Sequence, residues 1–251
     1  MSLQTVESNA TEKWDNTSQE VRSREVGVAP EIKKYLDDIL VGILAHPGVE
    51  HKFLNYYGEN KLSELQQKQL YSECFYFFQY LPFYVTGMAN KTRDENILRE
   101  IVLNVYDEVG HKITHSSIYK SFMRKIDMDY DEVLSYEPLE VTKKLNDGIR
   151  KLYTECSIEK SLGALYADET MSSIMVSKLN DGLKNQGHDA LVRSFWEMHI
   201  EVEIGHSNSV FNAIAPYVHS SDTKKEFEEG VSDFLSLLED YWNGVEKLLA
   251  H

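Results

Sequence analysis

Three residues in the last quarter of the chain have the types and spacing of metal ligands. They are His199, Glu203 and His206, within the segment FWEMHIEVEIGHSNSV. Because a helix advances about 100° per residue, Glu203 lies about 40° to one side of His199 and His206 about 20° to the other. Apolar neighbours predict that this helix is buried, where His and Glu are costly unless they are paired or bind a metal. Two imidazoles and a carboxylate on one stripe favour a first-row transition metal.

Two other segments carry residues that could complete this site. In LNVYDEVGHKITHSSIYKSF, Glu108 and His115 are seven residues apart and share one helix face, while His111 lies about 60° off the same stripe. In SLGALYADETMSS, Glu169 follows a run of small residues, which would let its helix approach its neighbours closely. The adjacent Asp168 is an alternative inward carboxylate. Three helices are therefore expected to supply the ligands.

The number and type of these residues indicate two metal ions. The candidate ligands are Glu108, His115, Glu169, His199, Glu203 and His206, with His111 as an alternative first imidazole. Three carboxylates and three imidazoles are too many for one zinc ion, and they suit two ions that share carboxylate bridges. Mixed nitrogen and oxygen ligation favours iron or manganese over a metal that prefers thiolates.

The motifs around these residues resemble those of the heme-oxygenase-like dimetal oxidases and oxygenases, a family of iron-containing redox enzymes. The resemblance extends from about Pro30 to the C-terminus. It is carried by D-E-x-G-x4-H-S-x-I-Y-x2-F at 107–122, A-L-Y-A-D-E at 164–169 and F-x3-H-x3-E-x2-H at 195–206. Family members use a Glu with a His seven residues later, a mid-chain Glu, and H-x3-D/E-x2-H. Residue by residue, these positions fall on the six candidate ligands named above.

Two positions qualify this match. Family members often have Asp where this chain has Glu203, and the longer side chain would chelate or bridge the ions differently. Some relatives take their first imidazole three residues after the Glu, which is the position of His111 here. The resemblance implies an all-α, heme-oxygenase-like bundle and an O2-dependent non-haem diiron oxidoreductase.

The activity that the resemblance implies is oxidation of a small molecule, with two Fe2+ ions as cofactor, O2 as co-substrate and manganese as another candidate metal. The expected substrate is an amino acid or amino-acid derivative in specialised metabolism, and the expected outcome is N-oxygenation or oxidative C–C cleavage. The alternatives are decarboxylation of a fatty acid to a terminal alkene, and a non-catalytic ferritin-like iron-binding protein. The sequence identifies no catalytic residue beyond the metal ligands.

A ferritin-like four-helix bundle is the alternative fold. There are E-x-x-H motifs at 108–111 and 203–206. Each has a Glu about 35 residues upstream, which is Glu73 for the first motif and Glu169 for the second. This is the pattern of ferritin-like di-iron proteins. It leaves His115 and His199 without a role, although both lie on the ligand stripes, and it does not account for the longer resemblance.

Composition excludes several classes of protein. A chain of 251 residues with 42% hydrophobic residues is long enough for a sizeable core. The net charge of −15 argues against a nucleic-acid partner, which would require a basic face. The longest aromatic run, FYFFQYLPFYV, is too short to cross a bilayer and is interrupted by Gln79 and Pro82, so it predicts a kinked core helix. We expect a small-molecule substrate and no membrane partner, and the sequence allows a homodimer.

The cysteines and the N-terminus indicate a cytoplasmic protein. Cys74 and Cys156 lie far apart and outside any C-x2-C spacing, so packed thiols in a reducing compartment are expected. The N-terminal residues lack the apolar segment of a signal peptide.

Helical periodicity organises the chain. Residues 1–28 are polar without apolar periodicity, and we expect a flexible tail there, followed by a single domain at 29–251. Pro30 can open the first helix. Apolar residues recur at helical spacing in about seven predicted helices, at 32–44, 65–85, 98–126, 139–153, 162–183, 190–214 and 227–249. Gly110 weakens the third of these near the candidate ligands.

Overall fold

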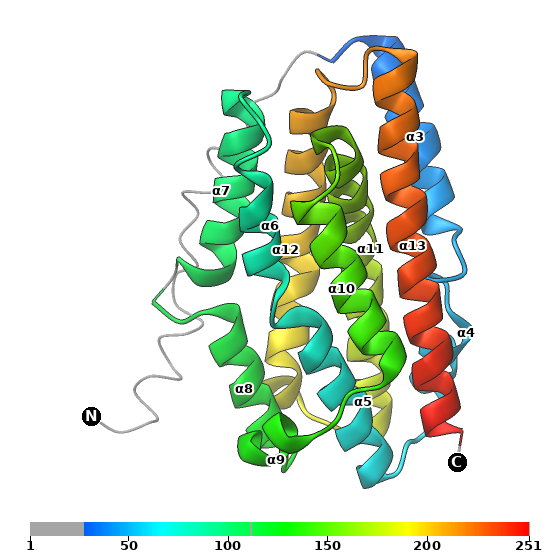
Figure 1. Ribbon diagram of the computed structural model, residues 1–251. Coiled ribbons are helices and arrows are strands. Elements are labelled where there is room, and N and C mark those ends of the chain that lie inside the picture. The colour runs from blue at the N-terminus through cyan, green and yellow to red at the C-terminus, as the bar shows by residue number, and fades with distance from the viewer. Residues whose placement is uncertain (1–27, 111, 251) are drawn as a thin grey trace.

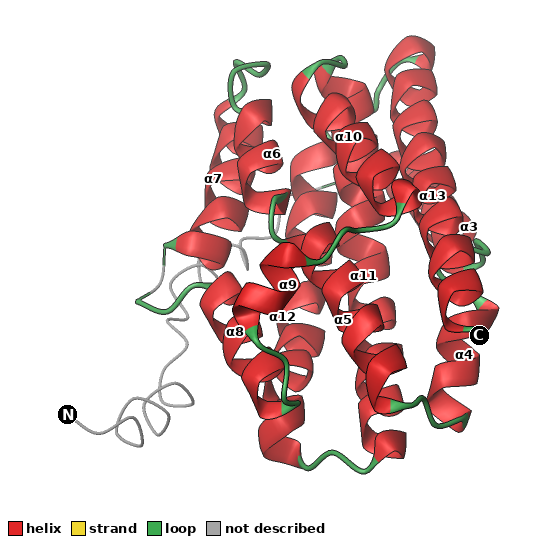
Figure 2. Cartoon of the chain, turned by 60° about the horizontal axis from the view of Figure 1, so that its bottom comes forward, coloured by secondary structure: helices red, strands yellow, loops and turns green. Residues whose placement is uncertain are grey.

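The protein is helical throughout the part of the chain that the structure describes. This computed structural model describes residues 28–110 and 112–250, with the backbone alone at 201–209 and 212. Within those residues it has eleven helices and no strand (Figure 1 and Figure 2). The all-α prediction is confirmed. The predicted tail lies outside the described residues apart from residue 28.

The helices are joined by short connections, and the longest ones lie side by side. The bounds are α3 (Pro30–Leu44), α4 (Lys52–Glu59), α5 (Glu64–Phe78), α6 (Leu81–Met88), α7 (Glu95–Val109), α8 (His115–Lys125), α9 (Tyr130–Ser135), α10 (Glu140–Thr154), α11 (Ile158–Gln186), α12 (Ala190–Ile214) and α13 (Ser221–Leu249). α11 packs against both α12 and α13, and α10 lies against α13 (Figure 1). The seven predicted runs correspond to nine of these helices, and the short α4 and α9 are additional.

The central helix α11 is buried because small residues let α13 approach it closely. Every residue from 161 to 171 is buried. Gly163 of α11 and Gly230 of α13 lie at the crossing, where a Cβ atom on Gly163 would be 2.0 Å from the oxygen of Phe227 and one on Gly230 would be 1.9 Å from the oxygen of Lys160. No side chain fits at either position. The predicted close approach is confirmed, with α13 as the partner.

The predicted helix at 65–85 is divided rather than kinked. α5 ends at Phe78 and α6 begins at Leu81, with Pro82 in its first turn. Pro82 has no N–H to donate to the carbonyl of Phe78, so a continuous helix would lose a hydrogen bond there. In the first turn of a new helix that N–H is not needed.

The predicted helix at 98–126 is also divided, and this separates Glu108 from His115. α7 ends one residue after Glu108, with Gly110 at its C-cap. α8 begins at His115, where the Thr114 hydroxyl accepts a hydrogen bond from the Ser117 N–H. Because such a cap satisfies a backbone donor of a new helix, the chain starts α8 here instead of continuing α7. The prediction that the two residues share a face of one continuous helix is therefore wrong.

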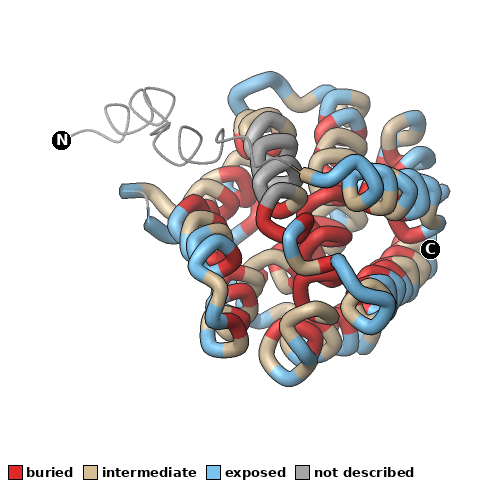
Figure 3. Tube along the Cα trace, turned by 90° about the horizontal axis from the view of Figure 1, so that it is seen from above, coloured by how far each residue is buried: buried red, intermediate tan, exposed pale blue. Residues whose placement is uncertain are grey.

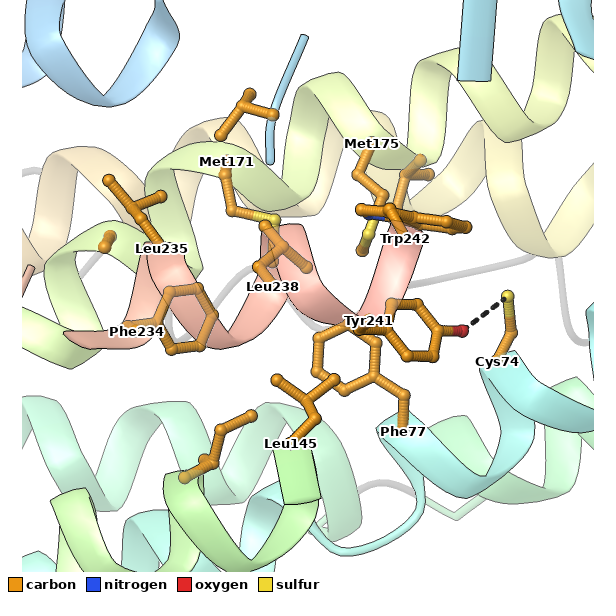
Figure 4. Packing of buried hydrophobic residues seen from close by; sticks show 14 of the residues in the cluster. Cys74, Phe77, Leu145, Met171, Met175, Phe234, Leu235, Leu238, Tyr241 and Trp242 are labelled. Atoms are coloured by element: carbon orange, nitrogen blue, oxygen red, sulfur yellow. Dashed lines mark hydrogen bonds between the residues drawn. The ribbon is translucent and has the colours of Figure 1, made fainter. Parts of the chain in front are cut away.

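Apolar side chains of α5, α10, α11 and α13 pack together in a core to which the other described helices also contribute. Figure 3 shows that the buried residues face inward and that the exposed ones lie on the outside. In Figure 4, Tyr241 of α13 lies beside Phe77 of α5, with 5.4 Å between ring centroids, and its hydroxyl donates to Sγ of Cys74 at 3.7 Å. The predicted packed thiol is confirmed for Cys74, whereas Cys156 is half-buried. None of the described helices is both long and apolar enough to cross a bilayer.

Candidate metal centre

Glu108, His115 and His199 meet where the end of α7, the start of α8 and the middle of α12 come together. The Nδ1 atom of His115 lies 2.9 Å from Oε1 of Glu108 and 3.2 Å from Nε2 of His199. Both imidazoles are buried, and their ring centroids are 4.5 Å apart. The fold thus brings three of the six predicted ligands into contact, each from a different helix.

The helix that carries His199 also fixes the orientation of its ring. Its Nδ1 atom lies 2.7 Å from the carbonyl oxygen of Phe195, one turn earlier in α12. A carbonyl only accepts hydrogen bonds, so Nδ1 carries a proton, and in the neutral imidazole that binds metals Nε2 presents its lone pair toward His115. The phenyl ring of Phe195 packs against the imidazole, with 4.0 Å between centroids. A partner that fixes the tautomer in this way is typical of histidines that bind metals.

The types of donor at this contact fit iron. One carboxylate and two imidazoles supply mixed oxygen and nitrogen ligation. The contacting atoms lie about 3 Å apart, as do neighbouring ligands that are each about 2.1 Å from one ion. Among the described side chains, Glu108 contacts His115 and His199 also contacts His115. No three potential ligands among these side chains surround a common point. Glu203 and His206, two further residues of the predicted ligand set, follow His199 in the same helix.

Glu169 lies on α11 and is held by a residue of α7. It is buried, and its Oε1 atom accepts a hydrogen bond from Nδ2 of Asn104. Asn104 lies one helical turn before Glu108, so the same face of α7 that carries one candidate ligand positions another. Asn104 is not among the residues predicted from the sequence. Its spacing from Glu108 was the only signal in the sequence, since its partner is 65 residues away.

The neighbouring Asp168 also points inward. Its Oδ2 atom accepts a 2.8 Å hydrogen bond from the hydroxyl of Tyr153. Burial and the Asp168 carboxylate raise the pKa of Tyr153 well above its usual value, so this phenol keeps its proton and donates. Asp168, and not Glu169, is among the described residues that line the cavity beside the candidate ligands. Both carboxylates of this pair are therefore directed into the protein, toward different neighbours.

Two of the predicted ligands, Glu203 and His206, and the alternative ligand His111 lie partly or wholly outside the described residues. The backbone of Glu203 and His206 belongs to α12, so they share one helix with His199 as predicted, but their side chains lie outside the described residues. His111 lies outside the described residues altogether.

Glu73, the additional carboxylate of the ferritin-like interpretation, has a structural role. It is fully buried, and its Oε1 atom accepts hydrogen bonds from the Tyr136 hydroxyl at 2.5 Å and the Leu139 N–H at 3.0 Å. Its Oε2 atom accepts a hydrogen bond from the Thr142 hydroxyl. The carboxylate thus joins α5 to the start of α10 and does not line the cavity described next.

A cavity of about 330 Å³ lies beside Glu108, His115 and His199. This volume is at the lower end of the range of about 300–1,000 Å³ that is usual for small-molecule sites. The walls are mostly apolar, and they include the aromatic residues Phe75, Phe77, Phe78, Phe83, Tyr119 and Phe195. Met171 and Met175 of α11, which Figure 4 shows packed in the core, also line the cavity. A small substrate would fit here, next to the candidate ligands.

Solved proteins with a heme-oxygenase-like fold have the same arrangement of helices. A CADD-like protein of unknown function from Nostoc punctiforme superposes with a TM-score of 0.76 at 16% identity, over 89% of this chain and 100% of that chain. A domain of unknown function with a heme oxygenase-like fold from Shewanella denitrificans superposes with a TM-score of 0.66 at 15% identity, over 87% of this chain and 94% of that chain. These similarities show the fold, and they confirm the heme-oxygenase-like prediction over the ferritin-like alternative.

Similarity of sequence shows the family. The model of a family described as iron-containing redox enzymes matches residues 68–239, which include all the candidate ligands. The chain is also 59% identical over 250 residues to the 4-chloro-allylglycine synthase of Streptantibioticus cattleyicolor, covering 98% of this chain and 97% of that protein. This protein belongs to the family of iron-containing redox enzymes and is an oxidoreductase, as its motifs predict.

Proposed function

We propose that the protein uses two iron ions and O2 to oxidise a small chlorinated amino acid. The observation that carries this proposal is the contact between Glu108, His115 and His199 beside a cavity of small-molecule size. Membership of the family supports iron. The presence of two ions, the use of O2 and the identity of the substrate are parts of the proposal.

In this proposal six residues hold the two ions. They are Glu108, His115, Glu169, His199, Glu203 and His206, with His111 as the alternative to His115. Bound iron would supply the activation of O2 that oxidation of an unactivated carbon chain requires. The protein contributes the geometry: the Phe195 carbonyl directs Nε2 of His199, and the Asn104 amide holds Glu169. The aromatic walls keep bulk water away from the reacting part of the substrate.

The name of the 59% identical relative supports the class of substrate. Its product, 4-chloro-allylglycine, is an α-amino acid with a chlorine atom and a C=C bond in its side chain. Of the two outcomes expected from the family resemblance, only oxidative C–C cleavage gives an alkene: one carbon loses a hydrogen, its neighbour loses the next carbon of the chain as an oxidised fragment, and O2 is the oxidant. We therefore propose cleavage of a saturated, chlorinated α-amino acid. The apolar walls suit its aliphatic side chain, and the carboxylate of Asp168 in the lining suits its ammonium group.

Oxygen consumption by iron-loaded protein tests this function. The candidate substrates are saturated α-amino acids with chlorine at position 4 and increasing side-chain length, compared with their unchlorinated analogues and with medium-chain fatty acids. We expect consumption of O2 with a chlorinated amino acid, and an unsaturated amino acid as product by mass spectrometry. Consumption with fatty acids alone would make the protein a decarboxylase. A lack of substrate-dependent consumption throughout would leave a non-catalytic iron-binding protein.

A further inference from the structure

We propose that the side-chain amide of Gln79 binds the α-carboxylate of the substrate and so directs the substrate's side chain toward Glu108, His115 and His199. This inference rests on the proposed function, because it assigns the recognition of that amino acid.

Gln79 stands at the division between α5 and α6. α5 ends at Phe78, and the N–H of Gln79 donates to the carbonyl of Phe75 at 3.1 Å, as the cap of that helix. The chain then turns before Pro82, so the Gln79 side chain is not part of a continuous helical face. It lines the cavity together with the candidate ligands.

The amide of Gln79 has an unused hydrogen-bond donor. Its Nε2 atom is buried and has no hydrogen-bond partner among the described residues. A glutamine amide nitrogen carries two donor hydrogens, and burying them without an acceptor destabilises a folded protein. Such atoms are uncommon in native proteins, and each calls for a partner such as a bound water, an ion or a ligand. An acceptor on a bound substrate would provide it here.

The other polar groups of the lining leave few donors for a carboxylate. No Lys or Arg is among the described residues that line the cavity. The hydroxyl of Ser172 donates to the carbonyl of Asp168, and that of Tyr119 donates to the carbonyl of Tyr71. The hydroxyl of Thr114 accepts from the Ser117 N–H and lies 2.9 Å from the hydroxyl of Ser117. Ser116 also lines the cavity, but it is exposed, so water competes for its hydroxyl. Among the described lining residues, Gln79 thus supplies a buried donor that has no acceptor within the described part of the protein.

The charges of the lining favour the same orientation of a zwitterionic amino acid, with its carboxylate toward Gln79. Asp168 of α11, which is not one of the six proposed ligands, brings negative charge to the cavity, and this charge attracts an ammonium group and repels a carboxylate. The neutral amide of Gln79 comes from a different element, the junction of α5 and α6. Because the C=C bond of the relative's product is in its side chain, an anchor on the α-carboxylate leaves the reacting part free.

Two substitutions of Gln79 separate recognition from folding. Gln79→Leu removes the donor, and Gln79→Glu keeps the shape but places a negative charge against the carboxylate. The control is Gln186→Leu at the end of α11, where the side-chain amide is satisfied by the Leu62 N–H and the Asn60 carbonyl. We expect Gln79→Leu to keep or raise the melting temperature, since it removes an unpaired donor, and Gln186→Leu to lower it.

Substrate affinity is measured by calorimetry on the metal-free protein, and KM and kcat are measured separately on the iron-loaded protein. We expect Gln79→Leu to weaken amino-acid binding roughly tenfold and Gln79→Glu roughly 100-fold, in KM more than in kcat. Gln186→Leu should leave both quantities unchanged. With a substrate analogue whose carboxylate is replaced by a methyl group, wild type and Gln79→Leu should bind alike.

The outcomes distinguish this inference from the proposed function. If the wild type binds and oxidises the amino acid but neither Gln79 variant changes its affinity, Gln79 does not recognise the substrate and only this inference fails. Substitution of Gln79 could instead change the discrimination against an analogue that lacks the ammonium group. The amide would then contact the ammonium end of the substrate, and the inference also fails. If the wild type binds no α-amino acid, the proposed function and this inference fail together.

Discussion

The crossing of α11 with α13 and the junction of α7, α8 and α12 are both buried, but they are built differently. At the crossing, two glycines bring the backbones of α11 and α13 together. Farther along the same two helices the packed side chains are apolar, among them Met171, Leu235 and Leu238 (Figure 4). At the junction, one helix ends and another begins, and a carboxylate and two imidazoles lie in contact. The first arrangement suits stability, since close packing of apolar groups stabilises a fold. The second buries polar groups at a cost to stability, which a metal ion would offset.

The largest effect is expected at the crossing. Gly230→Ala places a Cβ atom 1.9 Å from the backbone oxygen of Lys160, so α11 and α13 must separate. We expect a loss of roughly 3 kcal/mol or more in the free energy of unfolding, measured by urea denaturation of metal-free protein. Gly42→Ala is the control, because nothing lies within 4 Å of its added Cβ. That substitution should stabilise α3 by about 0.5–1 kcal/mol. Equal effects of the two substitutions would mean that the close approach does not stabilise the bundle.

The second effect tests whether the junction extends along α12 to Glu203. Glu203→Gln keeps the length of the side chain but removes the negative charge that offsets a dication, whereas Glu203→Asp keeps the charge and shortens the reach. We expect the Gln variant to lose the second iron almost entirely. The Asp variant should retain part of it and react differently with O2. Two tightly bound irons and unchanged O2 consumption in both variants would show that Glu203 is not a ligand.

A third effect concerns the support of a ligand by α7. Asn104→Leu removes the amide that donates to Glu169. We expect iron affinity to fall roughly 10–100-fold, as is usual when the partner of a metal ligand is removed. Asn96→Ala, at an exposed position of the same helix, should bind iron like the wild type. If anaerobic titration gives the same affinity for Asn104→Leu and for Asn96→Ala, Glu169 does not depend on Asn104.

The smallest effect concerns a histidine far from both regions. His51 caps α4 by accepting from the Phe53 N–H, and burial lowers its pKa from the usual value of 6.5. Because the unfolded chain then binds a proton more readily than the folded protein, stability falls as the pH decreases through about 6.5, by at most about 1.4 kcal/mol per pH unit. His51→Asn keeps a capping side chain that does not titrate. Between pH 7.5 and 5.5 the metal-free variant should lose less stability than the wild type, and an equal loss would exclude His51 as a source of this dependence.

The two regions also differ in how far the sequence predicts them. The helical periodicity and the small residues of α11 predict the all-α fold and its close packing, because both depend on neighbours along the chain. The contact of His115 with His199 follows from residue types at helical spacing, although the assumption of one continuous helix for Glu108 and His115 is wrong. Gly110 and Thr114 carried the local signals for that division, a weak helix former followed by a capping residue.

The remaining features of the site depend on partners that are distant in sequence. Asn104 meets Glu169, and Tyr153 meets Asp168, only once α7, α10 and α11 are packed. Gln79 becomes a cavity residue only because the chain breaks before Pro82. Periodicity along one helix contains no information on such pairs.

Anaerobic titration with Fe2+ tests the central claim most directly, that the contact between Glu108, His115 and His199 belongs to a dimetal site. Wild-type protein should bind about two Fe2+ per chain and gain thermal stability on binding. His115→Ala should abolish binding of the two ions and the gain in thermal stability. His111→Ala should have a milder effect on both. Absence of tight iron in the wild type would contradict the account. So would intact binding of two irons by His115→Ala alongside loss of them in His111→Ala, which would move the first imidazole ligand to His111.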